Sequence, residues 1–218
     1  MPSLPDLQTI SGANILIGLV VTAAFVVLIA DWRLALYALT AQYVLSAILL
    51  VAMIPPAIAV VRAISGALAM AILYLTLRHA ADERRRTQVA AGEVARQYQV
   101  FVVGFPFRLF ALALVAVTII GIASSMTFLS LPADVLFSSL WLISAGVLVA
   151  ILSRDVLRLG LGILMFTGGF CILETATEGG LLLYGLLNIS DLLLVLVIAH
   201  LGALPMEEGN ERRRRGEV

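Results

Sequence analysis

The sequence contains no lysine, one cysteine and two histidines, and only 13% of its 218 residues are charged. The single cysteine, Cys171, cannot form an internal disulfide and has no neighbours at metal-ligand spacing. Fourteen arginines balance fourteen acids, and no patch of interleaved basic and aromatic residues is present. These absences argue against a nucleic-acid partner, and they predict no metal and no cofactor.

Hydrophobic residues dominate the composition of the chain. They make up 61% of the chain, and the mean hydropathy is +1.07. A soluble globule of this length exposes too much surface to bury that much apolar chain. We therefore expect an all-α integral membrane protein, rather than a soluble enzyme, a secreted disulfide scaffold or a disordered chain. Helices are favoured because unpaired backbone groups cannot face lipid and no alternating barrel pattern appears.

The apolar runs set the number of spans. A bilayer core about 30 Å thick requires about 20 residues of helix, and this criterion predicts seven transmembrane helices. The Pro55-Pro56 pair separates the second from the third, since neither proline continues a helix. The expected spans are residues 13–30, 34–54, 57–77, 107–127, 135–152, 156–175 and 181–204.

The arginines predict the orientation. All loop arginines fall in alternate connections, on one side of a seven-span chain, whereas the opposite side carries only acids. The positive-inside rule then places the N-terminus outside and the C-terminus in the cytoplasm. The expected organisation is a three-helix half, a cytoplasmic Arg-rich loop, a four-helix half and a cytoplasmic charged tail. Their respective bounds are 1–77, 78–106, 107–204 and 205–218.

Two of these polar segments leave structural questions. The sequence of residues 78–99 is compatible with two structures, a short helix lying on the cytoplasmic surface and a solvated loop containing helical turns. Residues 207–218 are interpreted as a disordered charge run that helps to set topology, rather than as a binding motif.

Asp191 is the leading functional candidate, because it lies near the middle of the last predicted span. It follows Leu181 by ten residues, or about 15 Å of helix. Charges at that depth are costly and usually face a partner inside the protein. Burial there favours the neutral, protonated carboxyl unless a cation lies close, which makes Asp191 a proton-binding candidate. The alternative is a polar clamp between two helices.

Arg62 and Glu174 complete the proton-translocation candidates. Arg62 lies in the third predicted span, and it either extends its long side chain to water or pairs with an acid. Its two candidate partners are Glu174, near the outer end of the sixth span, and Asp191. Glu174 and Glu178 can also be read as solvated acids at a helix end.

The sixth predicted span is rich in glycine. Gly162, Gly168 and Gly169 lie in it, as does Gly160. Small residues allow neighbouring helices to approach closely in lipid, so we expect this span to lie in the interior or at a helix interface. No nucleophile and base pair or phosphate-binding loop appears, and no catalytic residue is predicted.

Ser153-Arg154-Asp155-Val156-Leu157-Arg158, followed by Gly162, resembles a segment of hydrogenase-4 component E. That family has an Arg-Asn-hydrophobic-Leu-Arg run at the start of a helix and a glycine four residues after the second arginine. It is related to the 4L (K-type) subunit of respiratory complex I, which has three spans. Residues 135–204 resemble that three-helix unit, and the length and hydrophobic N-terminal half also resemble component E.

The resemblance implies a role for Asp191. It matches the membrane-embedded acid of the last helix, which takes part in proton translocation in these assemblies. The family's acid in the preceding helix falls at Leu164 or Thr167, and neither is a carboxylate. One of two implied proton sites is therefore absent, and Glu174 lies about two turns too far out to replace it well.

These observations give three functional hypotheses. The first is a membrane-arm subunit of a complex I-like or group 4 hydrogenase-like assembly in the inner (plasma) membrane, beside antiporter-like and quinone-site subunits. The second is a purely structural or assembly subunit without a proton path. The third is a free-standing transporter, although no inverted repeat or broken pair of spans marks a substrate site.

Overall fold

The structure, a computed structural model, describes residues 12–29, 31–51, 53–91, 104–125, 131–153, 155–177 and 180–214. Every regular element in these ranges is an α-helix, so the expected all-α class holds for the described chain. The helices are α1 (Gly12–Leu28), α2 (Trp32–Leu50), α3 (Pro56–Ala91), α4 (Phe105–Ser125), α5 (Ala133–Leu152), α6 (Val156–Thr177) and α7 (Leu181–Arg214).

Six of the helices, α2 to α7, are long and apolar enough to cross a membrane, and α1 contributes a shorter apolar segment, Asn14–Leu28. Many large apolar side chains on their outer faces are exposed, among them Phe110, Val117 and Leu182. A water-soluble protein rarely exposes so large an apolar surface. The chain is therefore a helical membrane protein with multiple apolar helices.

The loop predicted for residues 78–106 is wrong over its first part. Helix α3 continues without a break from the apolar span to Ala91, so residues 78–91 form neither a separate surface helix nor a loop. Residues 67–91 contain neither glycine nor proline, and nothing in the sequence interrupts the helix. Residues 92–103 lie outside the described ranges, and α4 begins at Phe105.

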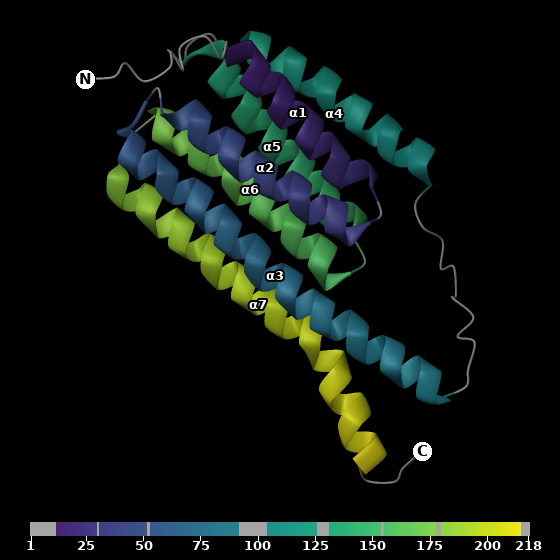
Figure 1. Cartoon of the computed structure of the whole chain (residues 1–218). Helices are drawn as coiled ribbons and strands as arrows, with labels where there is room; N and C mark the ends of the chain where they lie inside the picture. Colours follow the sequence, from purple (N-terminus) through teal and green to yellow (C-terminus); the bar gives the residue numbers. More distant parts are fainter. Residues whose placement is uncertain are drawn as a thin grey trace.

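The charged tail is also helical rather than disordered as far as it is described. Helix α7 runs to Arg214, and residues 215–218 lie outside the described chain. The sequence places Glu208 four residues before Arg212, a spacing that supports a helix. Figure 1 shows α7 bending away from α3 in its C-terminal part.

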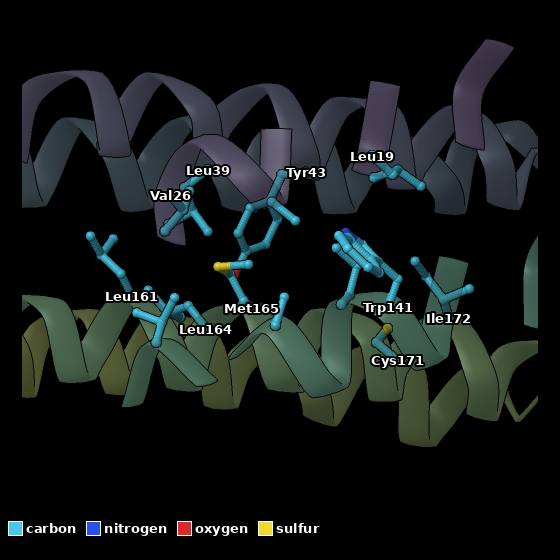
Figure 2. Close-up of a cluster of buried hydrophobic side chains, with 14 of the residues drawn as sticks. Leu19, Val26, Leu39, Tyr43, Trp141, Leu161, Leu164, Met165, Cys171 and Ile172 are labelled. Carbon is cyan, nitrogen blue, oxygen red and sulfur yellow. The ribbon is translucent and has the colours of Figure 1, made fainter. Parts of the chain in front are cut away.

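The helices pack as a bundle with α4 at its edge (Figure 1). Helix α2 contacts α1, α3 and α6, while α7 packs along α3 and α6. In the close-up of Figure 2, side chains from α1 and α2 meet those from α5 and α6 in a common core, and Tyr43 points from α2 toward the α6 layer. The four helices α2, α3, α6 and α7 therefore enclose a shared interior.

Glycines allow a close approach between α5 and α6. A Cβ atom added to Gly162 would lie 2.7 Å from the backbone nitrogen of Ala150, and one added to Gly169 would lie 2.7 Å from that of Ile143. Real side-chain atoms do not approach a backbone so closely, so the two helices are in direct backbone contact here. The glycine-rich helix α6 thus lies at an interface on this face, while Gly168 faces elsewhere.

Candidate functional site

Asp191 is buried among four helices. It lies ten residues, about 15 Å, from the start of α7, and its residue surface is only 2% exposed. Tyr184 and Asn188 precede it by seven and three residues and are also buried, so the three side chains share one face of α7. This face packs against α3 and α6. The acid is thus held in the interior of the bundle and does not face lipid.

Arg62 is the cationic partner of Asp191. Its Nη1 atom lies 3.5 Å from Asp191 Oδ2, and the residue is 1% exposed. Of the two acids that the sequence offered to Arg62, the structure therefore pairs it with Asp191. The alternative in which Arg62 extends to water is wrong, because a helix bundle surrounds its guanidinium. The pairing gives the buried carboxyl a cationic neighbour inside the bundle.

Two hydroxyl groups complete the surroundings of the carboxylate. Tyr43 on α2 donates its phenolic hydrogen to Asp191 Oδ2 at 2.9 Å. Thr167 on α6 lies 2.6 Å from Oδ1 through its Oγ1 atom. Each oxygen of Asp191 therefore has a hydroxyl partner, and Oδ2 also faces Arg62. Neutral donors and one cation together offset the cost of removing the carboxylate from water.

Arg62 is fixed by contacts other than the acid. Its Nε donates to Ser46 Oγ at 3.2 Å, and its Nη1 lies 3.4 Å from Asn188 Oδ1. Its Cζ lies 4.7 Å from the centre of the Tyr43 ring, which is within cation–π range. The same tyrosine thus contacts the cation through its ring and the anion through its hydroxyl.

The acceptors of Arg62 are themselves oriented by the backbone. Ser46 Oγ donates to the Tyr43 carbonyl at 2.8 Å, which leaves its lone pairs for Arg62. Asn188 Nδ2 donates to the Tyr184 carbonyl at 2.8 Å, which turns its Oδ1 toward Arg62. Both are bonds within one helix, so each acceptor is oriented by its own helix.

Two glycines make room for the site. A Cβ atom on Gly168 would lie 3.0 Å from Arg62 Nη2, so the guanidinium lies directly against the α6 backbone. A Cβ on Gly66 would overlap Tyr43 Cβ, which places α2 against α3 at the level of the site. Gly168, one of the glycines noted in the sequence, thus contacts the candidate site itself.

Glu174 lies apart from the pair but is not a solvated acid. It is 6% exposed on α6, and its Oε1 would lie 3.3 Å from a Cβ on Gly180, just before α7. The solvated alternative for Glu174 is therefore wrong, because its side chain is buried beside Gly180. Glu178 lies outside the described residues.

The buried polar side chains of α6 and α7 lie at and to one side of Asp191. Toward the α6–α7 turn these helices bury Asn188, Glu174 and Thr175. Toward the other end, the described buried side chains are apolar, and they include Leu161 and Val195. The site therefore has a polar side, at the turn, and an apolar side.

The positions at which the resemblance implies a second acid also lie beside this site. Leu164 is wholly buried, and Thr167 is the residue that contacts Asp191 Oδ1. Thr167 thus offers Asp191 a hydroxyl group, where the resemblance implies a carboxylate. The local pair has one negative and one positive charge.

Tyr43, Ser46 and Asn188 contact the buried pair but were not predicted as site residues from the sequence. A signal for the first two was present, since Gln42, Tyr43 and Ser46 are polar groups at helical spacing within an apolar span. Asn188 begins the sequence Asn188-Ile189-Ser190, which matches a glycosylation sequon, but a sequon inside an apolar span gives no indication of a polar contact. The described residues contain no group of three or more His, Cys, Asp and Glu side chains that could hold a metal.

The ionised carboxylate of Asp191 and the guanidinium of Arg62 together carry no net formal charge.

Comparison of the chain with protein-family profiles, with curated proteins and with solved structures gave no match.

Proposed function

We propose that this protein is a membrane-arm subunit of a complex I-like or group 4 hydrogenase-like assembly, in which Asp191 binds and releases a proton during turnover. It has no redox cofactor of its own and packs against antiporter-like and quinone-site subunits in the inner (plasma) membrane. The observation that carries this proposal is the buried Arg62–Asp191 pair, with Tyr43 and Thr167 on the two carboxylate oxygens.

The contacts of Arg62 explain how Asp191 could change its charge. A buried cation that loses its only counter-ion is strongly destabilised. Arg62 also has the oxygens of Ser46 and Asn188 and the Tyr43 ring, each a partner for a positive charge. These contacts limit the cost of protonating Asp191, which a proton carrier requires and a permanent ion pair does not.

Glu174 provides the second protonatable group of the proposed path. It lies on the polar side of Asp191, about two turns along α6 from Thr167, and it is buried. It does not occupy the position of the family's second acid, so the path in this chain would run along α6 toward the turn into α7.

The proposed topology has seven spans with the N-terminus outside. Helix α1, with 17 residues, is about 25 Å long and lies at the lower end of the range for a span. Counting it places every loop arginine on one side. Protease access to tags at the two termini in oriented vesicles tests this: the tags should be cut from opposite sides.

The experiment that tests the proton role is Asp191→Asn in the intact assembly. We expect electron transfer to continue at a reduced rate while proton pumping per electron falls severalfold. Asp155→Asn is the matched control, because Asp155 is an exposed acid just before α6. Undiminished pumping in Asp191→Asn would refute the proton role.

The second candidate is a structural subunit, and one observation favours it. The polar contacts around Arg62 and Asp191 join α2, α3, α6 and α7 through single side chains, as a clamp between helices would. On this hypothesis Asp191→Asn lowers the amount of assembled complex on blue-native electrophoresis, while each remaining complex pumps normally. The two measurements together separate the candidates.

A further inference from the structure

A small cavity lies on the α2 side of the Arg62–Asp191 pair. Its volume is about 10 Å³, and its polar lining comes from Gln42, Tyr43, Ser46 and Arg62. Leu39 and Leu164 form part of the apolar wall. A space of this size holds about one water molecule, and a water requires two to four polar partners.

Gln42 is the residue that the candidate site leaves unexplained. It is 3% exposed, and its Oε1 atom has no hydrogen-bond partner among the described residues. Buried polar atoms in native proteins nearly always have a partner, either from the protein or from an ordered water. Since Gln42 lines this cavity, its buried acceptor without a partner indicates an occupant that donates a hydrogen bond.

The charges around the cavity define that occupant further. The Arg62 guanidinium repels a cation, while the Gln42 carbonyl oxygen repels an anion. The volume excludes anything much larger than one heavy atom. A neutral molecule that both donates and accepts is the one that fits.

We infer that the cavity is a binding site for a single water molecule, which donates to Gln42 Oε1 and accepts from the Arg62 guanidinium. The water joins Gln42 to the network of Arg62, Ser46 and Asp191. The cation of the buried pair is thus hydrated from the α2 side, although the pair is enclosed by protein. The proposed water site does not depend on whether Asp191 carries protons.

Crystal structures grown in a lipid mesophase test the inference, for the wild-type protein and for Gln42→Met and Gln42→Glu. Methionine retains the volume of glutamine without its acceptor, whereas glutamate retains an acceptor. We expect one ordered water between residue 42 and Arg62 in the wild type and in Gln42→Glu, and none in Gln42→Met. A direct bond from Arg62 to Gln42, a dry cavity, or a water that persists in Gln42→Met would each overturn the inference.

A second measurement requires no variant. In solid-state NMR of the wild-type protein in lipid, magnetisation transferred from water should reach the side chains of Gln42 and Arg62 early. The methyl groups of Leu161, buried at 1% exposure on the apolar side, are the internal control. Equal and slow transfer to all three residues would show that no water lies beside Gln42.

Discussion

Arg62 Nη1 and Asp191 Oδ2 lie 3.5 Å apart, and both residues are almost wholly enclosed by the bundle. The two come from α3 and α7, and the Tyr43 side chain from α2 contacts both. The pair therefore depends on the packing of three helices. Each partner makes the burial of the other tolerable, and this mutual dependence leads to the first prediction.

Removing Arg62 alone should cost more than removing both partners, whereas the other contacts of Arg62 limit the cost of removing Asp191 alone. Arg62→Met leaves an unpaired buried carboxylate, and we expect it to lower the free energy of unfolding by about 3–5 kcal/mol. Adding Asp191→Asn to Arg62→Met should restore much of that loss, because no buried charge then remains. Thermal unfolding of Arg62→Met, Asp191→Asn and the double variant in the same detergent measures the effect. Strictly additive losses would show that the two charges do not interact.

Thr167 should matter through its hydroxyl rather than its shape. Thr167→Val retains the branched side chain but removes the group 2.6 Å from Asp191 Oδ1. A hydrogen bond to a charged group contributes about 1.5–3 kcal/mol, and we expect a loss of stability in that range. Thr167→Ser restores the hydroxyl and should behave nearly as the wild type does. If valine and serine have the same effect, the contact with Asp191 contributes nothing.

Gly168 and Gly185 offer a matched pair of glycine substitutions. In Gly168→Ala the new methyl group would lie 3.0 Å from Arg62 Nη2, so the guanidinium must shift, and we expect a loss of about 1–3 kcal/mol. In Gly185→Ala nothing lies within 4 Å of the new atom, and the better helix former should leave stability unchanged or raise it by up to ~1 kcal/mol. Thermal unfolding of both variants measures the two changes in stability. A tolerated Gly168→Ala would mean that Arg62 has room to move.

Tyr43 joins the two charges, and its two contacts can be separated. Tyr43→Phe removes the hydroxyl that donates to Asp191 but retains the ring beneath Arg62, whereas Tyr43→Leu removes both. We expect phenylalanine to cost about 1.5–3 kcal/mol and leucine about 0.5–2 kcal/mol more. Equal losses in the two variants would assign the whole effect to the hydroxyl.

The position of the acid and a candidate cation for it, Arg62, could be predicted from the sequence, but its hydroxyl neighbours could not. Length and hydropathy placed Asp191 near the middle of a span because a midplane charge stands out in an apolar run. Thr167 did not stand out, since hydroxyl groups in apolar helices commonly bond to their own backbone. Thr40 and Thr76 do so here, each with the carbonyl four residues earlier. Only the packing of α6 against α7 shows that Thr167 also contacts an acid.

The C-terminal ends of α3 and α7 could not be predicted from hydropathy either. A criterion based on bilayer thickness ends a predicted helix where apolar residues end, at Leu77 on α3 and near Leu204 on α7. Backbone hydrogen bonds continue beyond those points, to Ala91 and Arg214, because a helix requires compatible residues and not apolar ones. Hydropathy therefore defines the membrane-spanning part of such a helix but not its full length.

The proposed function requires that Asp191 gain and lose a proton during turnover. Infrared difference spectroscopy of the intact assembly observes this event itself, with aspartate labelled at its carboxyl carbon. We expect a carbonyl band of protonated aspartate that appears during turnover and is absent from Asp191→Asn, while Asp155→Asn retains it. A spectrum in which Asp191 remains ionised at every stage, with normal pumping, would rule out a proton-carrying Asp191.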